Sequence, residues 1–91
     1  MTIVEREVTI INKLGLHARA ASKLAQLSQQ FSAKITISLE GNDADASSIM
    51  GLMLLAGGQG KQVKVIADGD DAELAAERIC QLINERFDEA E

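Results

Sequence analysis

The sequence predicts a single α+β domain in which helices cover one face of a largely antiparallel sheet. Residues 3–11, 34–40 and 62–67 alternate apolar with polar side chains, which is typical of half-buried strands. Residues 18–30 and 70–87 repeat apolar side chains every three or four positions, which is typical of amphipathic helices. Because alternating strands leave one sheet face in water, the helices should cover the other face and form a two-layer sandwich.

The first half of the chain should contain a strand, a helix and a second strand. Strand 3–11 ends where the glycine-containing segment 12–15 breaks the alternation. A helix follows from about residue 18 to residue 30. Its small-residue face comprises Ala21, Leu24, Ala25 and Ser28. Strand 34–40 then buries one side, on which Ile35, Ile37 and Leu39 lie.

A weak strand and a short helix are expected next. Residues 41–43 have strong turn chemistry, so 44–46 should form a short returning strand. Ser48 precedes the apolar run 49–55, which predicts a short helix capped by serine.

The C-terminal third should contain a loop, a strand and a helix. The glycine-rich loop 57–60 leads into strand 62–67. Asp70 and Glu73 have the spacing of a capping box at the start of the last helix. The buried stripe of that helix should comprise Leu74, Ala75, Ile79, Leu82, Ile83 and Phe87. The acidic residues 88–91 are expected to fray.

Composition limits the classes of function. A chain of 91 residues makes at most one domain, so residues 1–91 are treated as one unit. A net charge of -5 and only two aromatic residues argue against binding to nucleic acid. The single cysteine allows no internal disulfide, and neither a signal-peptide core nor a membrane-spanning run is present. We therefore expect a cytoplasmic protein without membrane insertion.

His17 is the only histidine, and it lies between the glycine turn and the first helix. A helix N-terminus offers unpaired N–H groups and a positive partial charge. With Arg19 nearby, the imidazole could attack a phosphoryl group while the cation and the helix hold the charge. The alternative is a surface histidine that only caps a helix, and from the residues alone this alternative is the better supported.

Other constellations carry less chemistry. One histidine and one cysteine provide no metal-ligand spacing, so neither a metal nor a cofactor is expected. A hydrolase that uses Cys80 and His17 would require the fold to bring them together, yet Cys80 lies beside the apolar stripe, where a free cysteine is usually a small hydrophobe. Segment 57–61 lacks the Gly-Lys-Ser/Thr ending of a phosphate loop and leads into a strand.

Ser48 and the run after it form a second candidate region. A phosphate on a hydroxyl at a helix N-cap would gain from the helix dipole, although serine is also simply a good cap. The apolar run is too wide for one buried face, so part of it should be an exposed docking patch, with burial in the core as the alternative. The residues concerned are Ile49, Met50, Leu52 and Met53.

Two motifs resemble the signatures of HPr, the histidine-containing phosphocarrier family of the bacterial phosphoenolpyruvate-dependent phosphotransferase system. They are Gly-Leu-His-Ala-Arg at 15–19 and Ser-Ile-Met-Gly at 48–51, about thirty residues apart and in the right order. The resemblance extends over essentially the whole chain. It implies an open-faced sandwich of four antiparallel strands with three helices on one face, in the order βαββαβα.

The resemblance also implies a phosphoryl carrier that is not an independent catalyst. His17 would accept a phosphoryl group on Nδ1 from phosphorylated enzyme I and donate it to an enzyme IIA-type protein, in sugar uptake or nitrogen-branch regulation. Arg19 would stabilise the charge, and Ser48 would match the serine that a dedicated kinase modifies in some bacteria. The partner-binding residues would be Ala20, Ile49, Met50 and Met53. We expect a monomer.

Two positions depart from the family pattern. Ala20 stands where most members have proline, and it adds a backbone N–H that could donate to bound phosphate. Ser47 stands where many regulated members carry a basic residue, which leaves recognition by a kinase open. Segment 12–15 is similar to both nitrogen-branch and some sugar-branch relatives, so the branch also stays open. The alternative function is a regulatory docking module controlled by phosphorylation of Ser48.

Overall fold

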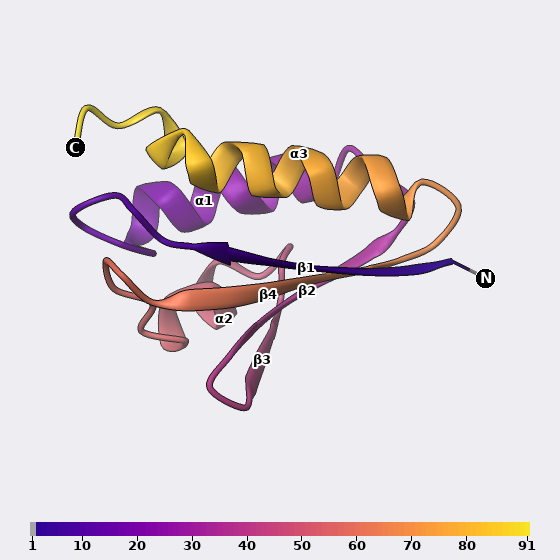
Figure 1. Cartoon of the computed structure of the whole chain (residues 1–91), viewed down its shortest axis with the longest axis horizontal. Coiled ribbons are helices and arrows are strands. Elements are labelled where there is room, and N and C mark those ends of the chain that lie inside the picture. Colours follow the sequence, from indigo (N-terminus) through magenta and orange to yellow (C-terminus); the bar gives the residue numbers. More distant parts are fainter. Residues whose placement is uncertain (1) are drawn as a thin grey trace.

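The computed structural model describes residues 2–91 and confirms the two-layer α+β architecture (Figure 1). The strands are β1 (Ile3–Thr9), β2 (Lys34–Leu39), β3 (Asn42–Asp45) and β4 (Gln62–Asp68). They form one sheet in the order β1-β4-β2-β3, and each neighbouring pair is antiparallel. The element order is therefore the predicted βαββαβα.

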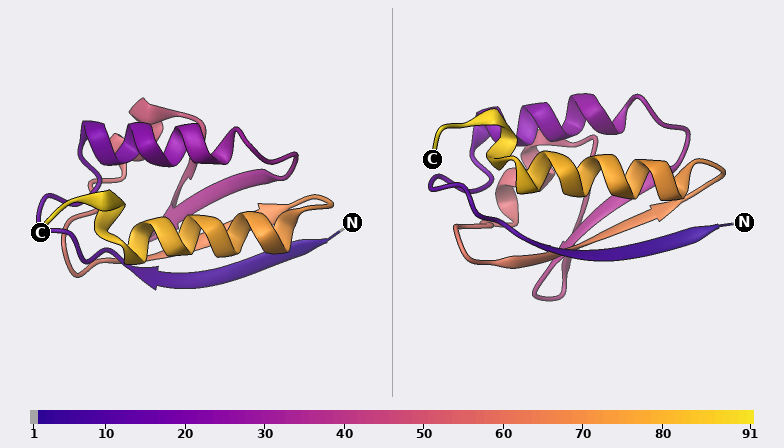
Figure 2. Two further views of the ribbon diagram at one scale, coloured as in Figure 1. Left: turned by 90° about the horizontal axis from the view of Figure 1, so that it is seen from above. Right: turned by 45° about the horizontal axis from the view of Figure 1, so that its top comes forward.

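The helices are α1 (Ala18–Ser28), α2 (Ile49–Leu54) and α3 (Ala72–Asn84), and a short turn η1 (Arg86–Asp88) follows α3. Helices α1 and α3 lie side by side over the sheet, as the two views of Figure 2 show. Helix α2 packs against α1 and β3. The end of β1, the start of α1 and the C-terminal end of the chain meet at one edge of the molecule (Figure 1).

The sheet follows the predicted alternation. Ile35, Ile37 and Leu39 of β2 are buried, as are Val63, Val65 and Ala67 of β4. Side chains between them, such as Lys64, face the uncovered side, where Lys64 pairs with Glu5 at 3.6 Å. The small face of α1 is also buried as expected, since Ala21, Leu24, Ala25 and Ser28 all lie in the interior.

The hairpin between β2 and β3 differs from the expected one. Leu39 pairs with Asn42, so the turn consists of Glu40 and Gly41, and β3 begins two residues before the predicted strand 44–46. Both turn residues have positive φ angles, 52° and 84°, which suit the twist of a two-residue hairpin. The sequence places turn-forming residues here, but Asn42 and Asp43 belong to the strand.

The start and the stripe of α3 also differ in part. The N-cap is Asp71 instead of Asp70, so the predicted capping box is wrong. Leu74 is half exposed, whereas Ala72 and Ala76 are fully buried and take its place in the stripe. Phe87 is buried as expected, but it lies in η1 beyond the end of the helix.

Asp71 joins α3 to the segment between α1 and β2. Its two carboxylate oxygens accept hydrogen bonds from the backbone N–H groups of Ser32 and Ala33, both at 2.8 Å. The bond from Ser32 has the largest influence on the pKa of Asp71, and the net effect is a pKa below the ordinary 3.8. The folded state therefore favours the charged form of this carboxyl.

We expect Asp71→Asn to lower stability at neutral pH and to reduce the loss of stability in acid. Because the folded pKa is depressed, the contribution of Asp71 is complete above the unfolded pKa and disappears as the pH falls through the folded pKa. Thermal unfolding from neutral pH to about pH 2 measures this dependence. The exposed neighbour Asp70→Asn is the control, and an equal acid dependence in both variants would contradict the assignment.

Candidate functional site

His17 is placed by a loop that connects β1 to α1 and is fixed against the segment between α2 and β4. The N–H of Ile10 donates to the Lys61 oxygen at 2.8 Å, and the Ile10 oxygen accepts from Gly60 at 2.7 Å. Further along, the N–H of Leu16 donates to the Gly57 oxygen at 2.9 Å. These backbone bonds hold the loop on both sides of the turn that precedes His17.

Gly15 is required at that turn for two reasons. Its φ of 66° lies in the left-handed region, which favours glycine. A Cβ atom at this position would also lie 2.3 Å from the Gly57 oxygen. The turn can therefore approach the neighbouring loop closely enough to form the Leu16 bond only because residue 15 has no side chain.

His17 occupies the N-cap position of α1, with extended backbone angles of -76° and 178°. Its backbone oxygen accepts the first helical hydrogen bond, from Ala21 at 2.9 Å. Its imidazole makes no capping hydrogen bond, so the side chain has a role other than closing the helix. The N–H groups of residues 18–20 precede that first bond and belong to the positive end of the helix.

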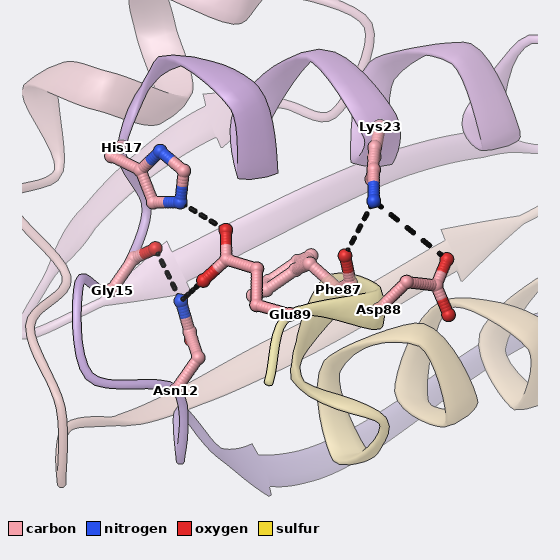
Figure 3. Close-up of polar contacts among 7 residues, drawn as sticks. All are labelled: Asn12, Gly15, His17, Lys23, Phe87, Asp88 and Glu89. Atoms are coloured by element: carbon pink, nitrogen blue, oxygen red, sulfur yellow. Dashed lines mark hydrogen bonds and ion pairs between the residues drawn. The ribbon is translucent and has the colours of Figure 1, made fainter. Parts of the chain in front are cut away.

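The imidazole contacts the C-terminal segment of the chain. Nε2 of His17 is hydrogen-bonded to Oε2 of Glu89, and the two residues are 72 positions apart in sequence (Figure 3). The other carboxylate oxygen of Glu89 accepts a bond from Nδ2 of Asn12 at 3.0 Å. The same Nδ2 donates to the Gly15 oxygen at 2.9 Å. Asn12 therefore ties Glu89 to the turn that carries His17.

The expectation that residues 88–91 fray is wrong. Arg86, Phe87 and Asp88 all have positive φ angles, 58°, 52° and 64°, so η1 is a left-handed turn that bends the chain toward α1 after α3. The Phe87 side chain is fully buried and anchors this turn. Lys23 of α1 donates to the Phe87 oxygen at 2.7 Å and pairs with Asp88 at 3.8 Å (Figure 3). At the end of the segment, the N–H of Lys13 donates to the Glu91 oxygen at 3.0 Å.

Glu89 is held in its charged form. Burial is the largest single influence on the pKa of Glu89 and raises it, but the hydrogen bonds from Asn12 and His17 act in the opposite direction. Electrostatic attraction to His17 and to the Arg19 guanidinium adds to those bonds, and the net result is a pKa of Glu89 below the ordinary 4.5. A carboxylate therefore faces the imidazole at neutral pH.

A hollow of about 780 Å³ lies between the start of α1 and the C-terminal segment. His17 and Arg19 both line it, so the structure brings the two predicted site residues together. It is lined by Lys13, Leu14, His17, Ala18, Arg19, Lys23, Asp88, Glu89, Ala90 and Glu91. Positive side chains come from the β1–α1 loop and from α1, and acidic side chains come from the C-terminal segment. We call these last residues, 86–91, the C-terminal strap.

Ser48 and the apolar run have the predicted arrangement. Ser48 is the N-cap of α2, and its Oγ accepts from the Gly51 N–H at 3.0 Å. Leu52 is buried, whereas Ile49, Met50 and Met53 are 42%, 70% and 40% exposed. The run is therefore partly core and partly an exposed apolar surface, as its width indicates.

Two other residues do not join the site. Ala20 lies on the buried face of α1 and its side chain is fully buried, so the expectation that it contacts partners is wrong for its methyl group. Cys80 lines a different hollow, with Arg6 and Glu73, and burial raises the pKa of its thiol. A protonated thiol away from His17 does not support the hydrolase hypothesis.

Sequence reasoning missed Glu89. An acidic residue two positions before the last printed residue resembles a solvated terminus, and no local pattern distinguishes it. The aromatic residue Phe87, two positions earlier, could have indicated that this segment is ordered. A buried aromatic side chain keeps its neighbours in the chain close to the core.

Comparison with known proteins agrees with the fold and the motifs. Residues 4–85 match the family model described as the PTS HPr component phosphorylation site. The chain is 51% identical to the phosphocarrier protein NPr of Shewanella violacea, over 99% of both chains. It is 47% identical to the phosphocarrier protein HPr of Cupriavidus necator, over 98% of this chain and 100% of that protein.

A solved structure gives the same result. The crystal structure of HPr-C-His from Thermoanaerobacter tengcongensis superposes with a TM-score of 0.92 at 40% identity, covering 97% of this chain and 99% of the other. The motifs at 15–19 and 48–51 lie within the matched residues 4–85. The chain therefore belongs to the HPr family and is a phosphocarrier protein of the phosphotransferase system, a carrier of phosphoryl groups and not an independent catalyst.

Proposed function

We propose that His17 is the residue that carries the phosphoryl group, and that Nδ1 is the atom that bonds to phosphorus. The observation that carries this proposal is the engagement of Nε2 by Glu89. Only one ring nitrogen is then left to act as a nucleophile, and it lies on the side of the ring away from Glu89 (Figure 3). The N–H groups at the start of α1 supply positive charge near the ring, and Arg19 lines the same hollow as His17.

The transfer can be written without any further reagent. The lone pair of Nδ1 forms a bond to the phosphorus atom of the phosphohistidine on the donor, enzyme I. The P–N bond on the donor breaks, and its electron pair returns to the donor nitrogen. The reverse roles apply when His17 donates to an enzyme IIA-type acceptor. The relatives include both NPr and HPr proteins, so acceptors of the nitrogen and sugar branches are both substrates to test.

Mapping the phosphate tests the assignment. After incubation with enzyme I and phosphoenolpyruvate, we expect one phosphate per chain, labile in acid and stable in base, in the peptide that contains His17. The 31P and 15N spectra of the product should place it on Nδ1. A phosphate on Nε2 or in a different peptide would overturn the assignment.

For Ser48 we propose a regulatory phosphorylation site served by an HPr kinase. Ser48 is half-buried at the start of α2, next to the exposed residues Ile49 and Met50, so a phosphate there would change the charge of the apolar surface. Because Ser48 Oγ accepts from the Gly51 N–H, phosphorylation would also change this cap. We further propose that the exposed surface of Ile49, Met50 and Met53 contacts enzyme I and the acceptors, and that the protein works as a monomer.

Within residues 2–91, no helix has the length and apolar character needed to cross a membrane. We propose that the protein acts in the cytoplasm, where its phosphoryl donor and acceptors would meet it.

A further inference from the structure

The contact between Glu89 and His17 is held in place by burial and by a second hydrogen bond to the Glu89 carboxylate. Glu89 is 72 positions from His17 in the sequence, and its side chain is 12% exposed. Asn12, whose side chain is fully buried, holds the second carboxylate oxygen. The carboxylate thus meets two donors at once, one on the His17 ring and one on the loop that carries His17.

The strap that carries Glu89 adopts an unfavourable backbone to reach this place. Three successive residues that are not glycine have left-handed φ angles, a conformation that is unfavourable for residues with a Cβ atom. The burial of Phe87 and the bond from Lys23 to the Phe87 oxygen offset that cost. The cost would be avoided by a strap that pointed into water, so the position of Glu89 is specified by the fold.

We propose that Glu89 is a positioning residue for phosphoryl transfer, which acts through Nε2 of His17. This inference rests on the proposed function of His17 as the phosphoryl carrier. The Glu89 carboxylate accepts the Nε2–H bond and so keeps the proton on Nε2 and the lone pair on Nδ1. It also fixes the ring so that Nδ1 faces away from the strap and is open to the phosphoryl donor.

The carboxylate also matches the charge that the transfer creates. When Nδ1 bonds to phosphorus, the ring gives up its lone pair and becomes positively charged while Nε2 keeps its proton. Glu89 lies beside that proton, and a largely buried carboxylate that is hydrogen-bonded to Nε2–H stabilises a charged imidazole. Arg19 and the helix N-terminus can then stabilise the negative phosphoryl oxygens, because Glu89 already stabilises the positive charge of the ring.

The other charged groups near the ring do not provide this arrangement. Lys13 pairs with Glu91 at 3.5 Å, and Lys23 pairs with Asp88, so the two lysines are occupied by the strap itself. Glu91 is largely exposed, with 73% of its side chain accessible. It therefore provides a control residue on the same strap, with the same charge, that does not contact the imidazole.

The test compares Glu89→Ala and Glu89→Gln with Glu91→Gln. Because His17 is the only histidine, a 1H–15N spectrum of the imidazole region reports on it without further assignment. In the unmodified protein and in Glu91→Gln, we expect an Nε2–H signal protected from exchange with water. In Glu89→Ala this signal should be lost. Glu89→Gln should show a weaker one, since one of the two carboxylate oxygens that accept from His17 and Asn12 is replaced by an NH2 group, which cannot accept.

Transfer kinetics with enzyme I supply the second measurement. Glu89→Ala should lower kcat for phosphoryl transfer about tenfold, the size expected for losing a hydrogen bond to a charged group, and should leave KM within about twofold. KM should hold because the exposed surface of Ile49, Met50 and Met53 is unchanged. Circular dichroism of each variant confirms that the fold is retained.

The outcomes separate this inference from the proposed function. Equal kcat values for Glu89→Ala and Glu91→Gln would overturn the positioning role, and so would an unchanged Nε2–H signal in Glu89→Ala. Failure of the unmodified protein to take up phosphate on His17 would instead overturn the proposed function, and the spectrum of the free protein would still report the Glu89 contact.

Discussion

His17→Ala is expected to abolish phosphoryl uptake, with a loss of more than about a thousandfold, because it removes the proposed nucleophile. The variant should stay folded. The imidazole makes no capping bond, but its removal leaves the Glu89 carboxylate with one donor fewer, so the unfolding free energy should fall by only about 1–3 kcal/mol. Transfer of labelled phosphate from phosphoenolpyruvate through enzyme I measures the first effect, and thermal unfolding measures the second.

Arg19→Ala is the comparison variant, because Arg19 lines the same hollow but carries no nucleophile. It should slow the transfer and keep the labelled site. Label that persists in His17→Ala would place the phosphoryl acceptor elsewhere in the chain and contradict the proposed function.

Gly15→Ala is expected to have the largest effect on stability, a loss of about 2–5 kcal/mol. A left-handed residue with a Cβ costs about 1–2 kcal/mol, and crowding in a packed region adds about 1–3 kcal/mol. The crowding here is against backbone, since the new Cβ would lie 2.3 Å from the Gly57 oxygen and 2.9 Å from Gly58 Cα. To relieve it, the loop must move, which also displaces His17. The denaturant concentration at the midpoint of unfolding and the rate of phosphoryl uptake should therefore both fall.

Gly58→Ala provides the matched control from the opposite loop. A Cβ at Gly58 meets nothing within 4 Å, so this variant should unfold at nearly the denaturant concentration of the unmodified protein. If Gly15→Ala were as stable as Gly58→Ala, the close approach of the two loops would not be needed to hold the turn before His17.

Features that depend on local periodicity were predictable from the sequence. The buried positions of β2 and α1 follow from alternation and from three- and four-residue spacing, and the Ser48 cap follows from a hydroxyl before an apolar run. The site was partly predictable for the same reason. His17 and Arg19 are two residues apart at a helix start, so their proximity needs no knowledge of the tertiary structure.

Features that depend on distant contacts were not predictable. Asp71 occupies the N-cap position of α3 without a capping side-chain bond, because its carboxylate accepts from residues 32 and 33. Only the packing of α3 beside that segment shows why Asp71 and not Asp70 takes this position. Glu89 reaches His17 through a left-handed turn formed by residues that ordinarily avoid it. Local propensity argues against such a turn, and the burial of Phe87 outweighs it.

The position of the strap determines how this protein should be handled in the laboratory. The two chain ends lie at opposite ends of the molecule, and the C-terminal end lies beside Lys13, whose N–H binds the Glu91 oxygen (Figure 1). An affinity tag, fluorophore or surface-immobilisation handle joined after Glu91 would begin beside the strap that contacts the His17 imidazole, where we propose that phosphoryl transfer takes place. The same attachment at the N-terminal end would leave that edge of the molecule free.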